Sequence, residues 1–353
     1  MSAHRIRHLG AVGLVVTVGL AGSSASASAP ATGSRHATGS AQASSKIAFI
    51  IGGSNLPTSK RGPQTDGIYV MNADGSGKRL LTRSTSHLYA WSPDGRKIAF
   101  GRRRNGSDDI FVMNADGSGQ RNLTRTRNVL NQGAVWSPDG RKIAYMKNTG
   151  GAAFWIHVMN ADGSGKRRLT PNPAIFPTWS PDGRKIAFYT GRVFVMNADG
   201  TGKRFLTRDA SHLYAWSPDG RKIAFTGGDG DVYAINADGS GRRNLTRRPV
   251  DYGRGDDGAC PAWSPDGQKI AFDRGRGRGI FVMNADGSGQ RRLTHFGRQA
   301  RWSPDGTKIA FWSARNGNRD IFVMNADGSG LRNLTRTPKA DEVRFAWESG
   351  QVR

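Results

Sequence analysis

The sequence predicts an all-β protein, and more specifically a seven-bladed β-propeller built from four-stranded antiparallel blades. Two observations support this prediction: the element NADG occurs seven times in the 353 residues, and short β-branched and aromatic runs lie between its copies. The copies begin at Asn72, Asn114, Asn160, Asn197, Asn236, Asn284 and Asn325. They are spaced by about 42 residues on average, and a period of about 40–45 residues is typical of a propeller blade.

Short apolar runs supply the strands of each repeat. Residues 97–100 (KIAF) and 110–113 (IFVM) are unbroken runs that are too short for helices and apolar on both faces. Both faces of such strands must be covered, and neighbouring blades would cover them. Residues 92–95 (SPDG) and 114–117 (NADG) combine turn-forming polar residues with a glycine that tolerates a positive φ. Each repeat is therefore expected to consist of two successive hairpins.

The order of elements along the chain predicts how the ring closes. The first recognisable strand, residues 46–49, matches the second strand of the repeat, whereas the last, residues 344–347, matches the first strand. The C-terminal strand can therefore complete the first blade and close the ring. An open array would instead leave two apolar blade faces in water, at a cost of about 25 cal/mol per Å² of apolar area.

The repeat WSPDG, KIAF and VMNADG over residues 46–348 resembles that of the TolB-type propellers, which are WD-like repeat proteins of the bacterial envelope. The resemblance implies a propeller fold. Similar propellers serve as binding platforms, as peptidase gates and occasionally as lyases. TolB itself carries an α/β domain before a six-bladed propeller, whereas 45 residues precede the first strand here. We therefore expect a free-standing relative of TolB.

The first residues are typical of an export signal. Arg5 and Arg7 precede an apolar stretch over residues 9–21, which is followed by Ala-x-Ala cleavage patterns, so residues 1–29 are predicted to form a secretory signal peptide. An uncleaved anchor is the alternative. Residues 30–45 are rich in Ala, Ser, Thr and Gly, as in a flexible linker, and residues 349–353 form a tail. The mature protein is expected to be secreted or periplasmic, in the cell envelope, as a monomer without a membrane span.

The chain is strongly basic, with 52 Lys and Arg residues against 27 Asp and Glu residues, a formal net charge of +25. Such a charge could attract an anionic polymer such as nucleic acid, a glycan or a wall polymer. The basic residues are, however, spread over both faces of the predicted ring, and aromatic residues do not alternate with them as a platform for stacking bases requires. A solubilising surface is therefore the favoured interpretation.

The loops on one face of the predicted ring vary between repeats, while the turns on the other face are nearly identical. Variable loops on a rigid scaffold are where recognition usually resides. The most distinctive loops carry arginine runs, which could bind carboxylate, sulfate or phosphate groups of a partner or could simply be solvated loop tips. These candidate binding residues are Arg102, Arg103, Arg104, Arg274, Arg276 and Arg278.

A second candidate site comes from the segment SHLYAW, which occurs at residues 86–91 and again at 211–216. In a ring of seven, the two copies could place their histidines across the mouth of the central channel, with their tyrosines nearby. Duplication of a blade with both histidines merely exposed is the alternative. The candidate residues are His87, Tyr89, His212 and Tyr214.

No metal site and no cofactor is expected. A metal site normally needs three or four ligands, and beyond the two SHLYAW histidines the predicted propeller has only His157 and His295, of which His157 replaces a packing aromatic residue. The NADGSG element lacks the first Asp and the closing Glu of a calcium loop. The single cysteine, Cys260, excludes an intrachain disulfide and is expected to be a half-buried packing residue.

The sequence favours a non-catalytic role as a protein-binding scaffold. It contains no G-x-S-x-G nucleophile element, and the turn aspartates are expected to serve turn geometry. The expected partner is an envelope or extracellular protein. Two alternatives remain: binding of an anionic polymer, and a lyase or hydrolase activity at the channel mouth.

Overall fold

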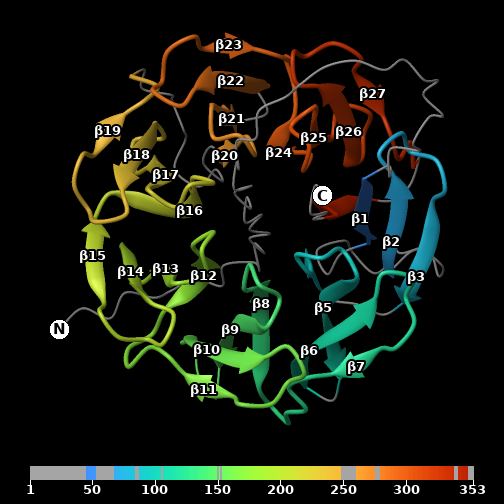
Figure 1. Ribbon diagram of the computed structural model, residues 1–353. Coiled ribbons are helices and arrows are strands. Elements are labelled where there is room, and N and C mark those ends of the chain that lie inside the picture. The colour runs from blue at the N-terminus through green and yellow to red at the C-terminus, as the bar shows by residue number, and fades with distance from the viewer. Residues whose placement is uncertain are drawn as a thin grey trace, which may run out of the picture.

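The computed structural model describes residues 45–52, 67–83, 87–104, 106–148, 151, 153–247, 260–274, 279–337 and 341–348. The predicted signal peptide, nearly all of the predicted linker and the C-terminal tail lie outside these residues. Within them, all regular structure is β-strand, and the strands form four-stranded antiparallel units arranged in a ring (Figure 1). The predicted all-β propeller fold with four-stranded antiparallel sheets is therefore confirmed.

The described strands form five four-stranded sheets and one eight-stranded sheet. They are grouped here by sequence repeat into units of four strands, numbered from the N-terminus, and units 2 and 3 together make up the eight-stranded sheet. Unit 1 holds β28 (Glu342–Trp347), β1 (Lys46–Ile51), β2 (Gly67–Asn72) and β3 (Arg79–Arg83); unit 2 holds β4 (His87–Trp91), β5 (Lys97–Arg104), β6 (Ser107–Asn114) and β7 (Arg121–Asn122). Unit 3 holds β8 (Leu130–Trp136), β9 (Lys142–Asn148), β10 (Trp155–Asn160) and β11 (Arg167–Arg168); unit 4 holds β12 (Ile175–Trp179), β13 (Lys185–Tyr189), β14 (Val193–Asn197) and β15 (Arg204–Thr207). Unit 5 holds β16 (Ala210–Trp216), β17 (Lys222–Gly227), β18 (Val232–Asn236) and β19 (Arg243–Asn244); unit 6 holds β20 (Ala262–Trp263), β21 (Lys269–Asp273), β22 (Ile280–Asn284) and β23 (Arg291–Arg292). Unit 7 holds β24 (Arg298–Trp302), β25 (Lys308–Ser313), β26 (Asp320–Asn325) and β27 (Arg332–Asn333).

The first and last strands of the chain pair with each other, as the order of elements predicted. β28 lies antiparallel to β1, with Ile47 opposite Trp347 and Phe49 opposite Phe345. The backbone N–H of Glu348 donates to the carbonyl oxygen of Lys46 at 2.7 Å, which extends the pairing by one residue. Unit 1 is thus assembled from both ends of the chain (Figure 1).

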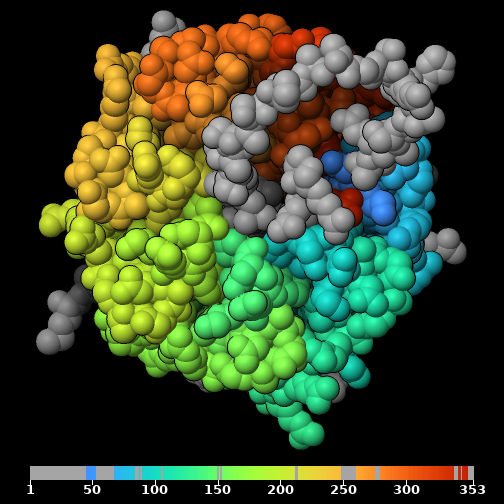
Figure 2. Space-filling model, in the orientation of Figure 1, coloured from blue at the N-terminus to red at the C-terminus, as the bar shows by residue number. Residues whose placement is uncertain are grey.

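The hydrophobic core is divided among the contacts between neighbouring units. Seven clusters of buried side chains each join one unit to the next, and one of them joins unit 7 to unit 1, where Ile321 and Val323 pack with Trp347. Neighbouring units such as units 3 and 4, green and yellow-green, meet along a continuous boundary in the space-filling view (Figure 2). The ring is therefore closed by packing as well as by strand pairing.

A tryptophan at the end of the first strand of each unit adds a hydrogen bond to most of these contacts. In six units its indole N–H donates to a backbone carbonyl in the preceding unit at 3.1–3.3 Å. The pairs are Trp91 with Ala346, Trp179 with Val135, Trp216 with Thr178, Trp263 with Ala215, Trp302 with Ala262, and Trp347 with Arg301. In unit 3, the indole N–H of Trp136 is buried and has no hydrogen-bond partner among the described residues. The repeated tryptophans thus serve blade packing, as expected.

Candidate functional site

The ring presents two faces that differ in composition. The turn face carries the SPDG turns, between the first and second strands of a unit, and the NADG turns, between the third and fourth strands. The loop face carries the connections between the second and third strands and those between units. The polar groups of the two faces make different contacts.

On the turn face, the repeated aspartates are bound within their own turns. In unit 2, the hydroxyl of Ser92 donates to Asp94 Oδ1 at 2.6 Å, and the N–H of Arg96 donates to the same oxygen at 3.1 Å. Burial disfavours the charged form of Asp94, but these hydrogen bonds outweigh it and hold the pKa below its usual value. In the NADG turn, Asp116 Oδ1 accepts from the hydroxyl and the N–H of Ser118 at 2.6 and 2.9 Å. These aspartates serve turn geometry, as the sequence predicted.

Arginines at the outer edge of the turn face link neighbouring units. In six units, the guanidinium group of an arginine on the fourth strand donates to a backbone carbonyl of the NADG aspartate in the next unit, at 2.8–3.5 Å. The pairs are Arg79 with Asp116, Arg121 with Asp162, Arg167 with Asp199, Arg204 with Asp238, Arg291 with Asp327, and Arg332 with Asp74. Part of the large positive charge therefore makes hydrogen bonds between neighbouring units.

On the loop face, three units share a buried polar set that the sequence analysis missed. In unit 2, Asp109 Oδ2 accepts from the amide of Asn122 at 2.8 Å, and Oδ1 accepts from the hydroxyl of Thr124 at 2.7 Å. Burial works against the charged form of Asp109, but these hydrogen bonds hold its pKa below the usual value. The same contacts join Asp231 with Asn244 and Thr246 in unit 5, and Asp320 with Asn333 and Thr335 in unit 7.

A sequence signal for this set does exist. The element RNLT, with Asn in its second position, occurs in the three repeats that have Asp directly before the apolar run of the third strand. The other four repeats have RLLT, RRLT, RFLT and RRLT there, and Gly67, Trp155, Arg192 and Gly279 occupy the position of the aspartate. The asparagine and the aspartate therefore occur together because they bind each other.

A buried glutamate extends this set at the closure of the ring. The hydroxyls of Thr335 and Thr337 donate to the carboxyl group of Glu342, which is only 1% exposed, at 3.1 and 2.5 Å. Burial, with the nearby charge of Asp320, raises the pKa of Glu342 from 4.5 to about 7. Glu342 lies on β28, so the strand that closes the ring carries a titratable group.

The arginine runs divide into bound and exposed residues. Arg102 stacks over the ring of Phe111 at 5.0 Å, and its guanidinium group donates to Thr82 Oγ1 at 2.7 Å. Arg274 stacks in the same way over Phe281, at 4.5 Å. These two predicted binding residues are thus held within the protein, because their long side chains cover aromatic pairs of their own units.

Of the other four arginines in the two runs, the structure describes two. The side chains of Arg103 and Arg104 are exposed at the end of β5. Arg276 and Arg278 lie outside the described residues. Of the predicted arginine site, therefore, Arg103 and Arg104 are the members that the structure places on the loop surface.

The SHLYAW side chains that the structure describes are buried or half-buried, and none is exposed. Burial, together with the charge of Arg344, lowers the pKa of His87 to about 3, so its ring is neutral. Tyr214 is 3% exposed and its hydroxyl donates to the backbone carbonyl of Phe176 in the preceding unit. Tyr214 was assigned to the channel mouth; the structure corrects this, since its side chain belongs to the contact between units 4 and 5. The side chains of Tyr89 and His212 are outside the described part of the chain.

Two further residues follow the sequence prediction. His157 lies against the ring of Tyr145, with ring centroids 5.6 Å apart, in the aromatic pair of unit 3. Cys260 is buried, and its backbone N–H donates to Asp273 Oδ1 at 2.8 Å. Within the described residues, no group of three or more His, Cys, Asp or Glu side chains is placed to hold a metal ion.

The comparisons with known proteins agree on the fold. The family model of the TolB beta propeller domain matches residues 28–190 and 192–347. TolB from Acinetobacter baumannii is similar in structure, with a TM-score of 0.55 and 18% sequence identity over 86% of this chain and 66% of that one. This chain thus covers slightly less than two thirds of that TolB. No curated protein matches the sequence significantly.

Two enzymes are also similar in structure. An oligogalacturonate lyase in complex with manganese has a TM-score of 0.57 and 14% identity, over 82% of this chain and 85% of the lyase. A puromycin hydrolase variant has a TM-score of 0.63 and 14% identity, over 83% of this chain and 52% of the hydrolase. At these identities the likeness shows the fold alone. In the part of the chain that the structure describes, no helix is long and apolar enough to cross a membrane.

Proposed function

The chain belongs to the TolB β-propeller family, and from this premise we propose that it is an exported, non-catalytic propeller that binds a protein of the cell envelope or extracellular space through its loop face. The proposal rests on one contrast between the two faces. The repeated polar groups of the turn face are used within turns and between units, whereas the loop face varies from unit to unit and carries exposed arginines such as Arg103 and Arg104.

The state of the candidate catalytic residues supports a role without catalysis. A general acid or base must reach its substrate and must exchange protons near the working pH. His87 is largely buried with a pKa of about 3, and the hydroxyl of Tyr214 is bound to a backbone carbonyl in the core. Neither group meets these requirements in the described arrangement, although similar propellers include a lyase and a hydrolase.

The use of arginines within the ring supports protein binding over capture of an anionic polymer. A site for a polyanion needs several free cations along one groove. Here the arginines at the outer edge of the turn face bind neighbouring carbonyls, while Arg102 and Arg274 cover aromatic pairs. The exposed arginines of the loop face are spread over several units, as Arg83, Arg104, Arg192 and Arg336 are, and each can bind a carboxylate of a protein partner.

Site-specific photocrosslinking tests the proposal. A photoreactive residue replaces Arg104 on the loop face, and in a matched variant it replaces Arg184, which is exposed in the SPDG turn of unit 4. Each variant is exported by the source cells or mixed with their envelope extract, and is then irradiated. We expect a discrete protein adduct from position 104 that survives about 0.5 M salt, where exposed charges are screened beyond a few ångströms, and no such adduct from position 184.

Three results would contradict the proposal. Equal adducts from both positions, or adducts that disappear in salt, would indicate nonspecific attraction to the basic surface or binding of an anionic polymer. Turnover of a glycan or peptide that is lost in H87A would indicate an enzyme. Mass measurement of the exported protein tests whether the predicted signal peptide is removed. Cleavage near residue 29 is expected, and an intact N-terminus would indicate a retained anchor.

A further inference from the structure

Four exposed arginines of unit 2 form a cluster on the loop face. Arg103 and Arg104 lie at the tip of the hairpin between β5 and β6, and Arg125 and Arg127 lie in the connection from β7 to β8. The arginine run in the sequence predicted the first two as binding residues, whereas the second two were not singled out. These four residues are the arginine cluster.

The hairpin tip and the connection are in direct contact. The N–H of Asp108 donates to the carbonyl oxygen of Val129 at 3.1 Å, and the N–H of Val129 donates to Ser107 Oγ at 3.4 Å. Asp108 also pairs in parallel with Leu130, which is the one place among the described strands where strands of two units pair. The fold therefore brings the two pairs of arginines onto neighbouring segments.

The backbone of Arg125 is fixed by the buried polar set of unit 2. Its φ is 51°, in the left-handed region that residues other than glycine rarely adopt. Asn122 Oδ1 accepts from the N–H of Arg125 at 2.9 Å. On the other side, Asp109 Oδ1 accepts from the N–H of Thr126 at 3.1 Å. An arginine on a backbone held in this way loses less freedom when it binds a partner.

The carboxylates of the hairpin do not neutralise the cluster at the surface. Asp108 and Asp109 are 5% and 4% exposed, and they accept hydrogen bonds inside the protein, such as that from Gln132 to Asp108 Oδ2 at 2.8 Å. The one ion pair between described residues joins Arg242 to Asp209. No arginine of the cluster is therefore paired with a carboxylate that the structure describes.

Like charges are crowded at this end of β5. Burial and the nearby charge of Arg104 lower the pKa of Arg102, which covers the aromatic pair of unit 2. An anion bound beside Arg104 would relieve this repulsion, because opposite charges at short range attract more strongly than the two guanidinium groups repel across a longer distance.

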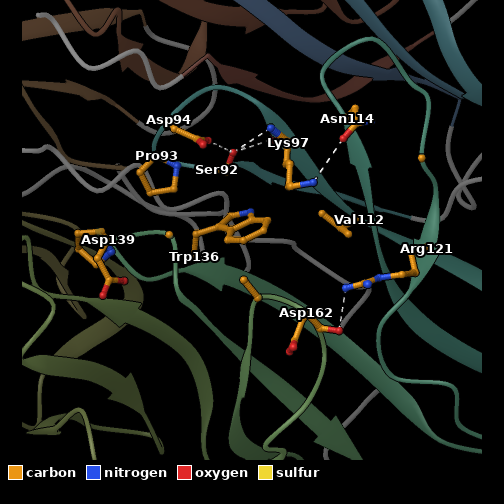
Figure 3. A pocket seen from close by; sticks show the side chains of 14 residues that line it. Ser92, Pro93, Asp94, Lys97, Val112, Asn114, Arg121, Trp136, Asp139 and Asp162 are labelled. Atoms are coloured by element: carbon orange, nitrogen blue, oxygen red, sulfur yellow. Dashed lines mark hydrogen bonds between the residues drawn. The ribbon is translucent and has the colours of Figure 1, made fainter.

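The turn face of the same contact between units 2 and 3 is different. A pocket of about 630 Å³, lined by Trp136, lies there, but its cations are bound within the protein (Figure 3). Lys97 donates to Asn114 Oδ1 at 3.3 Å. Arg121 donates to the carbonyl oxygen of Asp162 at 2.8 Å. The cations of this contact that are available to a partner therefore lie on the loop face.

Unit 5 shows which of these features are particular to unit 2. Arg247 is exposed and has the same backbone as Arg125, with a φ of 46° and an N–H that donates to Asn244 Oδ1 at 2.8 Å. The hairpin of unit 5, however, carries the exposed acid Asp229 at its tip instead of two arginines. A fixed arginine thus recurs in unit 5, but the concentration of positive charge does not.

We propose that the arginine cluster binds a short acidic segment of the protein partner, with guanidinium groups of the cluster donating paired hydrogen bonds to aspartate or glutamate carboxylates. This inference rests on the proposed function and gives the chemistry of the partner. The planar guanidinium group matches a carboxylate in such paired bonds. The cluster occupies two segments of one unit, which fits a short acidic segment, whereas a long anionic polymer needs cations along a continuous groove.

Fluorescence anisotropy with an acidic peptide tests the inference. The probe is rhodamine-labelled Gly-Asp-Asp-Asp-Asp-Gly, titrated with the full protein at about 0.15 M salt. We expect saturable binding with a Kd below about 100 µM, and a Kd at least about tenfold higher in R125E and in R104E. R247E is the matched control, because it changes the net charge equally and alters the same backbone position in unit 5. Its Kd should stay within about twofold of wild type.

The melting temperature of each variant shows whether it folds. All three arginines are exposed, so the variants should melt as wild type does. R104E does not alter the left-handed position, and it keeps the inference testable even where R125E unfolds.

Photocrosslinking separates this inference from the proposed function. The protein adduct from position 104 should be lost when Arg125 and Arg127 are both changed to glutamate, and it should persist in R247E. An adduct that persists in both variants would overturn the inference while the proposed function stands. Binding of the peptide without any protein adduct would support the cluster as a carboxylate site and contradict the proposed function.

Three results of the anisotropy titration would overturn the inference. The first is no saturable binding up to about 0.5 mM protein. The second is equal weakening by R125E and R247E, which would indicate nonspecific attraction to the net positive charge. The third is displacement of the probe by inorganic tetraphosphate at lower concentration than by the unlabelled peptide, which would assign the cluster to an anionic polymer.

Discussion

Replacing Glu342 by glutamine should remove a pH-dependent loss of stability from the strand that closes the ring. Glu342 is 1% exposed, faces the hydroxyls of Thr335 and Thr337, and lies near the carboxylate of Asp320. Burial disfavours the charged form of Glu342, while the two hydrogen bonds and the more distant charge of Lys78 favour it. The effect of burial is larger, so the pKa of Glu342 rises from 4.5 to about 7 on folding.

The size and sign of the effect follow from this shift. Because the folded protein holds the proton more tightly than the unfolded chain, the free energy of unfolding falls as the pH rises from about 4.5 to about 7 and is then constant. A shift from 4.5 to about 7 corresponds to about 3 kcal/mol. Glutamine cannot ionise and keeps the size of the side chain. The variant should therefore gain about 3 kcal/mol relative to wild type between about pH 4.5 and about pH 8.

Urea denaturation of both proteins at a series of pH values measures this difference. Other groups also titrate over this range, but they contribute equally to both proteins and cancel in the comparison. Glu348→Gln, at the half-buried end of the same strand, controls for the loss of a carboxylate near the closure. A difference between Glu342→Gln and wild type that does not change with pH would refute the reasoning.

Three further predictions follow from the same structure. Truncation after Asp341 removes β28, and since losing one buried Trp or Phe side chain alone costs about 3–5 kcal/mol, calorimetry should show a sharply lower melting temperature; an unchanged melt would argue against closure by this strand. Asn244→Ala leaves Asp231 buried without its 2.7 Å hydrogen bond and should cost about 2–3 kcal/mol in urea denaturation, whereas Arg292→Ala, at the matching position of unit 6, should stay within about 0.5 kcal/mol. The ring of His87 should show no titration by NMR between about pH 5 and about pH 8, because burial lowers its pKa to about 3; a midpoint near 6.5 would show that it is exposed.

Much of the fold could be predicted from the sequence because the turns of each repeat depend on interactions between residues that are close in the chain. The SPDG and NADG elements define their turns through bonds between residues two to five positions apart, such as those from Ser92 to Asp94 and from the N–H of Lys97 to Ser92. The closure by β28 followed from counting strand types along the chain. The Asp109–Asn122 pair was also present in the sequence, as a joint occurrence in three repeats, and was overlooked.

The candidate site was less predictable. Arg102 was predicted to bind a partner because it belongs to an arginine run, and Tyr214 because it belongs to the duplicated SHLYAW segment, yet Arg102 covers an aromatic pair and Tyr214 donates to a carbonyl 38 residues earlier in the chain. Residue type does not reveal such contacts, since they depend on how one unit meets the next. Nor does it reveal the environment of Glu342, which is assembled from β28 and the segment after β27.

The sequence by itself determined the repeating strands, the turns and the strand that joins the two ends, because these features depend on backbone preferences and on hydrogen bonds within a few residues. Only the tertiary structure decided which charged groups are used inside the ring and which remain at the surface. It also decided that one tryptophan, Trp136, keeps an unpartnered N–H beside a pocket while its six counterparts do not. The seven tryptophans occupy the same place in nearly identical repeats, and a hydrogen bond that crosses to another unit depends on how the two units meet, which no local pattern specifies.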